Sequence, residues 1–155
     1  MEYNFRFDEP AIGLLSPDSV HFFYYIVAKG ELEGETALYE WSEEIRSYLL
    51  NQGLCIKPCP IEELPSEFED CEILFAKGEN ENEAEAFIRH LRNAFAHYHI
   101  GEYEDYYKME DFNKQKMRTM IGKIKIEHLK KLCYLLLTQG EKYNENKLIV
   151  NPKEL

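Results

Sequence analysis

The chain has 155 residues, of which 45% are hydrophobic and 30% are charged, and its formal net charge is −11. That length suits one domain with a substantial core, and the hydrophobic content argues against intrinsic disorder. The sequence has no apolar run of about 20 residues, the length that spans a bilayer, and no secretory signal, so we expect a cytoplasmic protein. The negative net charge argues against general binding to nucleic acid.

The beginning of the chain predicts an extended segment followed by a buried helix. Residues 1–9 alternate between apolar and polar side chains, which favours a short strand or an extended arm. Ser16 before Pro17 is typical of a helix start, with serine as the cap and proline at the first helical position. The dense apolar and aromatic residues that follow predict a buried helix to about Lys29.

A second helix is predicted after an acidic turn that begins at Gly30. Thr36 suits its cap, and Gly53 suits its end. The segment after Gly53 contains three prolines that exclude a long helix, but it allows one helical turn at 61–64 and an extended piece at 71–76. The expected buried stripe of the second helix consists of Leu38, Trp41, Ile45, Tyr48 and Leu49.

We expect the chain to be organised around a helix over residues 84–100. Apolar residues recur there at spacings of three and four, which is the stripe of an amphipathic helix. The acidic run before it suits the helix dipole, and Gly101 suits a left-handed end. The stripe consists of Ala84, Phe87, Ile88, Leu91, Ala94, Phe95 and Tyr98.

The remainder of this helix mixes small, apolar and polar residues where a surface helix would carry lysine and glutamate. Such a face suits close packing against a second helix with polar groups in the seam, or a helix buried on both sides within one core. His90 is expected to be a surface histidine. The residues of this face are Ala86, Arg89, Asn93, Ala96, His97 and Ile100.

The last part of the chain predicts a hairpin and a final helix. Residues 106–113 and 117–124 suit two strands joined by a turn, and Gly122 suits a bulge. The final helix is predicted over 126–138, followed by a mostly polar tail, 141–155. Its buried stripe consists of Leu129, Leu132, Cys133, Leu136 and Leu137.

The cysteines and the charge pattern limit the kinds of site. The four cysteines fit no common zinc spacing, so we expect reduced thiols and no metal or cofactor, although Cys55 and Cys59 sharing a metal with a distant histidine is a less favoured alternative. Residues 114–131 carry seven basic side chains and one acidic side chain. This strip either follows a phosphate backbone or is a solvated face.

One stretch of the central helix carries a motif, Arg92-Asn93-Ala94-Phe95-Ala96-His97. It matches the pattern R-x(4–6)-H, and the order downstream, with Asp111 after a tyrosine-rich segment and then basic residues and a leucine-rich helix, is also similar. Over residues 84–139 the chain therefore resembles the HEPN superfamily. The resemblance implies a mainly α fold, a HEPN-like helical bundle with a small β-hairpin before the last helix. We expect one such domain over 1–155, with its core at about 16–139.

The resemblance also implies a function. It implies a metal-independent endoribonuclease, of the toxin or phage-defence kind, in which a ribose 2′-hydroxyl attacks its own 3′-phosphate. Arg92 and His97 would be catalytic and Asn93 would orient the histidine, with His99 as the alternative to His97. Further contacts to substrate are expected from Arg89, His99, Lys123 and Lys125.

Helix geometry adds a condition, because residues five apart lie about 140° apart around the axis. Arg92 and His97 therefore cannot easily grip one phosphate from one straight helix, and we expect a homodimer through the 84–100 helix. Expected partners are RNA, the second copy and an antitoxin or defence protein, but no membrane. Two alternatives stay open: a non-catalytic HEPN-like RNA-binding or antitoxin module, and a helical scaffold without a role in nucleic-acid binding.

Overall fold

The computed structural model describes residues 15–33 and 39–138. In these ranges four helices, α2 (Pro17–Glu33), α3 (Glu43–Asn51), α4 (Glu83–Ala96) and α5 (Ile126–Leu137), accompany five strands. The strands are β1 (Cys55–Pro58), β2 (Glu72–Phe75), β3 (Ile100–Tyr103), β4 (Tyr106–Phe112) and β5 (Arg118–Lys125), and a 3₁₀ turn, η2 (Ile61–Glu63), follows β1. The predicted extended segment 1–9, the Thr36 cap and the tail 141–155 lie outside the described residues.

The expectation of a mainly α bundle is wrong, because the strands form one mixed sheet in an α+β fold. Their order is β1-β2-β5-β4-β3, with β1 and β2 parallel and the other neighbours antiparallel. The predicted hairpin is thus the centre of a sheet. The edge strands β1 and β3 escaped prediction because each has only four residues, and they contain Pro58 and Gly101, which are poor strand formers.

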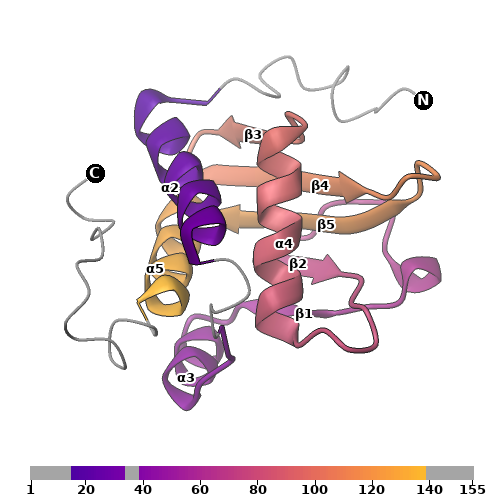
Figure 1. Ribbon diagram of the computed structural model, residues 1–155, viewed down its shortest axis with the longest axis horizontal. Coiled ribbons are helices and arrows are strands. Elements are labelled where there is room, and N and C mark those ends of the chain that lie inside the picture. The colour runs from indigo at the N-terminus through magenta and orange to yellow at the C-terminus, as the bar shows by residue number, and fades with distance from the viewer. Residues whose placement is uncertain (1–14, 34–38, 139–155) are drawn as a thin grey trace.

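The helices share one side of the sheet. Figure 1 shows α4 crossing the strands with α2 beside it, while α5 and α3 lie toward one end of the sheet. The predicted apolar stripe of α4 is mostly buried, but it packs on the sheet, and Tyr98, which lies beyond the end of the helix, is 69% exposed. The main sheet residues in this core are Ile73, Phe75, Tyr107, Met109, Met120 and Ile124.

The other predicted elements are confirmed with shifted bounds. Ser16 caps α2 by accepting from the Ser19 backbone N–H at 3.2 Å. The helix continues through Gly30, where a turn was predicted, and its Val20 and Tyr24 side chains are exposed. Ser42 caps the second helix, which ends before a left-handed Gly53, as predicted.

The segment after β1 covers the other face of the sheet, which gives the proline-rich stretch a structural role. The Arg118 guanidinium donates to the Pro65 carbonyl oxygen at 2.6 Å, and Lys123 Nζ lies 2.8 Å from a carboxylate oxygen of Asp70. The Lys108 ammonium lies over the Phe68 ring. No helix within the described ranges is long and apolar enough to span a bilayer.

Gly122 is in regular pairing with Ile73 and Met109, so the predicted bulge is wrong there; the register shifts between Asp111 and Phe112 instead. A Cβ on Gly122 would lie 2.7 Å from Ile73 Cγ1. Glycine is needed at this position because the Ile73 side chain occupies the space above it.

We predict that Gly122→Ala lowers the free energy of unfolding by about 1–3 kcal/mol through this overlap, as urea denaturation would measure. Gly78→Ala is the matched control, since its Cβ would meet nothing closer than 3.6 Å. Ile73→Ala should cost less in the Gly122→Ala background than alone, because it relieves the overlap. Strict additivity of the two substitutions would contradict this account.

Candidate functional site

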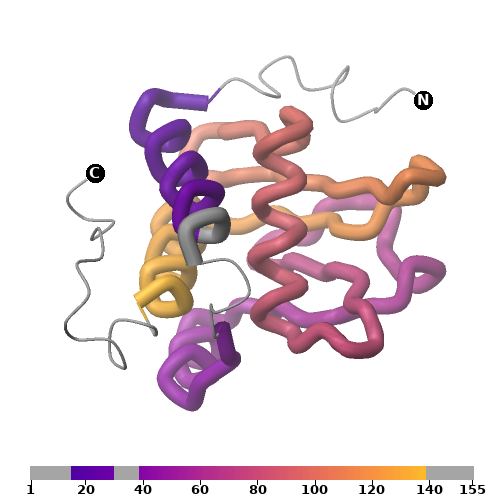
Figure 2. The backbone as a smooth tube through the Cα atoms, in the orientation of Figure 1, coloured from indigo at the N-terminus to yellow at the C-terminus, as the bar shows by residue number. Residues whose placement is uncertain are grey.

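A pocket of about 530 Å³ lies beside the C-terminal half of α4. Three segments line it: the loop that follows β2, one flank of α4 and the tip of the β4–β5 hairpin. The loop after β2 and the tip of the β4–β5 hairpin lie to the right of α4 in Figure 2. The lining residues are Ala76, Lys77, Gly78, Arg89, His90, Asn93, His97, Asp111, Phe112, Asn113, Lys114 and Thr119.

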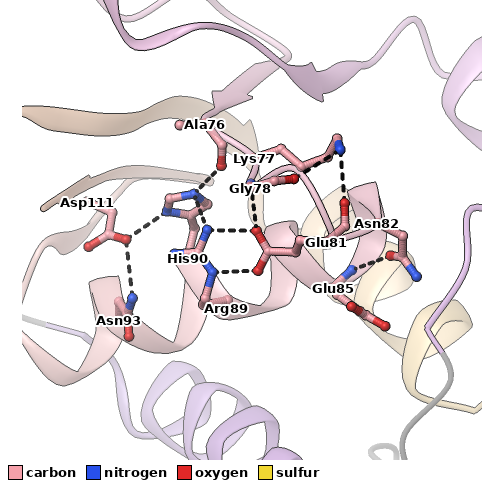
Figure 3. A network of polar contacts seen from close by, with 10 residues as sticks. All are labelled: Ala76, Lys77, Gly78, Glu81, Asn82, Glu85, Arg89, His90, Asn93 and Asp111. Carbon is pink, nitrogen blue, oxygen red and sulfur yellow. Dashed lines mark hydrogen bonds and ion pairs between the residues drawn. The ribbon is translucent and has the colours of Figure 1, made fainter. Parts of the chain in front are cut away.

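A buried, hydrogen-bonded pair, His90 and Asp111, forms the inner wall of the pocket. His90 Nδ1 lies 2.7 Å from Asp111 Oδ2, and His90 Nε2 lies 2.7 Å from the Ala76 carbonyl oxygen. Both side chains are almost fully buried. Figure 3 shows the His90 ring between Asp111 and the Ala76 carbonyl oxygen. Each ring nitrogen faces an oxygen acceptor, and Nε2 also lies 3.4 Å from Arg89 Nη2, so hydrogen bonds on both sides hold the ring in place.

His90 therefore joins α4 to two strands of the sheet. The prediction of a surface histidine is wrong, because the ring points inward to β4 and to the end of β2 rather than outward. Asn93, one turn later, lies on the same flank, with its amide 3.5 Å from Asp111 Oδ2. The other oxygen of Asp111 accepts from the Phe112 backbone N–H at 2.9 Å.

His97 is the exposed residue at the end of this flank. It is the C-cap of α4, where helical geometry stops. The next residue, Tyr98, is left-handed with φ 61°, and the His99 backbone N–H donates to the Ala94 carbonyl oxygen at 2.8 Å. Tyr98 thus provides the left-handed residue at the end of the helix, the role that was predicted for Gly101.

The turn at Tyr98 separates the two candidate histidines. His97 borders the pocket, whereas His99 is 7% exposed and contacts the edge of Phe112, with ring centroids 5.1 Å apart. Gly101 lies in β3, opposite Lys108. The pocket of one protomer is therefore lined by His97 and not by His99.

Arg92 lies on the opposite flank of α4 from the pocket. Its side chain is half-buried, and its Nε has no hydrogen-bond partner within the described residues. It does not line the pocket, as the about 140° between positions 92 and 97 requires. One chain thus brings Asn93 and His97 together but leaves Arg92 apart from them.

The remaining predicted contacts divide between the pocket and the far face of the sheet. Arg89 borders the pocket and holds Glu81 through two bonds, Nε to Oε2 at 2.7 Å and Nη2 to Oε1 at 3.0 Å. These bonds lower the pKa of Glu81. Lys123 pairs with Asp70 across the far face, and Lys125 ends β5 as the N-cap of α5; neither lines the pocket.

Sequence reasoning missed several members of the site. It did not assign Lys77 and Lys114, which come from two loops, or a pairing between Asp111 and His90. One signal was present: His90, Asn93 and His97 are spaced by three and four, which places them on one helix flank. The loop residues had no such signal, because their proximity depends on the sheet.

In the parts of the chain that the structure describes, no three histidine, cysteine or acidic side chains are placed to hold a metal ion. The four cysteines are free thiols, and complete burial raises the pKa of Cys133. The site is thus composed of histidine, amide and basic side chains around one buried carboxylate.

We predict that Asp111→Asn lowers the free energy of unfolding by about 1–3 kcal/mol, because the amide is a weaker acceptor for the buried His90 ring and its own N–H groups need new partners. Urea denaturation at neutral pH measures the loss. Asp105→Asn, at an exposed position in the β3–β4 turn, removes the same charge and should change stability by no more than about 0.5 kcal/mol. Equal effects of the two substitutions would contradict a stabilising His90–Asp111 pair.

We predict that Tyr98→Gly raises the free energy of unfolding by about 1 kcal/mol, since glycine adopts the left-handed conformation without steric cost. The Tyr98 side chain is 69% exposed, so little packing is lost. Tyr98→Ala keeps the Cβ and should give no such gain. Thermal or urea unfolding of both variants decides the matter.

Comparison with known proteins adds one finding. Residues 31–147 match a family model described as HEPN pEK499 p136. No curated protein and no solved structure matches the chain. The family match spans most of the chain, including α4, the sheet and α5. The protein therefore belongs to the HEPN superfamily, in the family HEPN pEK499 p136.

Proposed function

We propose that the protein is a metal-independent endoribonuclease whose active site forms between two protomers. The observation that carries the proposal is the position of His97, exposed at the border of a pocket that also contains Asn93 and basic side chains. Membership of the HEPN superfamily supports a role in RNA chemistry. Arg92, Asn93 and His97 are the residues we assign to catalysis.

The proposed reaction is an internal transfer within RNA. The 2′-hydroxyl loses its proton to a base and bonds to the adjacent phosphorus, while the bond from phosphorus to the 5′-oxygen breaks and that oxygen gains a proton. The products are a 2′,3′-cyclic phosphate and a free 5′-hydroxyl. Histidine side chains commonly serve as the base or the acid in such reactions, and an arginine fork stabilises charge on the phosphate.

A dimer could bring Arg92 and His97 into one site, although the two residues lie on different flanks of α4 in one chain. One His97 cannot both accept the first proton and donate the second in a single step, whereas two symmetry-related histidines can. On the outer flank of α4, Glu85 and Ala96 are exposed and Arg92 is half-buried, so a second copy could contact this flank. Antiparallel pairing of two such helices near their C-terminal ends would bring Arg92 of one protomer toward His97 of the other.

The proposed activity also requires a regulating partner in the cell. An unrestrained ribonuclease in the cytoplasm damages the RNA of its own cell, so a regulating protein partner is part of the proposal. A toxin silenced by an antitoxin, or a phage-defence effector released by infection, fits that need. Lys123 and Lys125, on the far face, are proposed only as peripheral contacts to a long RNA.

We predict that the purified protein cleaves single-stranded RNA in the presence of EDTA and leaves 2′,3′-cyclic phosphate ends. His97→Ala and Arg92→Ala should each lower the rate by about 10²–10⁴-fold, the range for loss of a general acid–base group or a charge-stabilising donor. End-group analysis and gel-based rates measure both. His21→Ala, at an exposed position on α2, should leave the rate unchanged.

The oligomeric state supplies an independent check. Light scattering should give a dimer, and adding an excess of the His97→Ala protein to the original protein should lower the activity more than dilution does, because a mixed dimer keeps only one of the two histidines of the shared site. Binding of RNA without cleavage would favour the non-catalytic alternative instead. An active monomer would overturn the shared site.

A further inference from the structure

We infer that Lys77 and Lys114 form a phosphate-binding subsite of the pocket, which holds a phosphodiester of single-stranded RNA next to His97. The choice of ligand rests on the proposed ribonuclease function. Neither lysine belongs to the Arg92–His97 motif, and they reach the pocket from different loops, one after β2 and one at the tip of the β4–β5 hairpin.

The first support is the charge of the pocket. Its lining has three basic side chains, Lys77, Arg89 and Lys114, and one carboxylate, Asp111. The whole chain, in contrast, carries a formal charge of −11. A concave basic site within an acidic protein concentrates an anionic ligand at one place and repels it from most of the remaining surface.

The second support is that two carboxylates at or beside the pocket, Asp111 and Glu81, are already bound. Asp111 is held by His90, and Glu81 is held by Arg89 and by the Gly78 backbone N–H at 3.1 Å. Among the described residues, no carboxylate forms an ion pair with Lys77 or Lys114. These two ammonium groups are thus the cations of the pocket whose charge is left for a ligand.

The third support is that both loops are held in place by their own contacts. Lys77 Nζ donates to the carbonyl oxygens of Gly78 at 3.2 Å and Glu81 at 2.9 Å (Figure 3). Asn113 Oδ1 accepts from the backbone N–H groups of Gln115 at 2.9 Å and Met117 at 3.0 Å, which fixes the turn that carries Lys114. Loops ordered before binding lose less entropy when a phosphate arrives.

The chemistry of the pocket distinguishes RNA from a free anion. A phosphodiester held by the two lysines lies in the same pocket as His97 and Asn93, which can face the adjoining ribose and phosphate. The volume of about 530 Å³ exceeds what a single phosphate needs and falls within the range of pockets for small organic ligands. We therefore expect a nucleotide unit of a chain to bind, and inorganic phosphate to bind weakly.

The test measures binding without cleavage. The probe is a short 2′-O-methyl oligoribonucleotide, which lacks the attacking hydroxyl, and fluorescence anisotropy gives its Kd at several salt concentrations. Lys114→Met should raise the Kd several-fold and make the slope of log K against log salt shallower by about 0.7, the value for one contact with single-stranded nucleic acid. Lys77→Met should do the same, and Lys77→Arg should restore binding.

Lys116→Met is the matched control, because Lys116 is exposed on the same turn but does not line the pocket. It should leave the Kd within about twofold of the original protein. The turn that carries Lys114 is held by Asn113, so the Lys114→Met variant stays informative even if Lys77→Met unfolds the loop after β2. Equal effects of Lys114→Met and Lys116→Met, or no effect of either, would overturn the subsite.

Two further results separate this inference from the nuclease proposal. Lysine-dependent binding in a protein that cleaves no RNA would sustain the subsite and reject the nuclease. Cleavage that is unchanged by Lys77→Met and Lys114→Met would sustain the nuclease and reject the subsite. Inorganic phosphate that binds as tightly as the oligonucleotide would overturn the assignment to RNA.

Discussion

The buried pair between His90 and Asp111 fixes the position of the central helix on the sheet. The ring bridges α4 to β4 on one side and to the Ala76 carbonyl oxygen on the other, with both contacts at 2.7 Å. Hydrogen-bonded groups removed from water hold their geometry closely, because any displacement leaves a buried donor or acceptor without a partner. Asn93 and His97 share the flank of His90, so this pair also decides which side of α4 faces the pocket.

The end of α4 sets what that pocket contains. The left-handed Tyr98 turns the chain into β3 and leaves His97 exposed while His99 becomes buried. Arg92 lies on the opposite flank of the helix. The R-x(4–6)-H motif is therefore divided between two surfaces of one chain, and this division is the physical reason for proposing that two protomers share the reaction.

The charged side chains are unevenly distributed: basic groups line the pocket, although the net charge of the chain is negative. Asp111 and Glu81 are bound by internal partners, His90 and Arg89, which reduces their opposition to an anion in the pocket. The segment after β1 neutralises part of the far face of the sheet, where Asp70 pairs with Lys123. The basic strip predicted from residues 114–131 is thus split, with Lys114 at the pocket and Lys123 on the other side of the molecule.

The sequence by itself determined the helices, the hairpin and the family motif, because periodic apolar residues, caps such as Ser16 and a contiguous motif are local signals. It did not determine the sheet, since β1 and β3 are short edge strands that are stabilised by neighbours distant in the chain. Only the tertiary structure decided that His90 is buried against Asp111 and that Lys77 and Lys114 meet at one pocket. Those relations arise where segments far apart in sequence pack together, and no spacing along the chain records them.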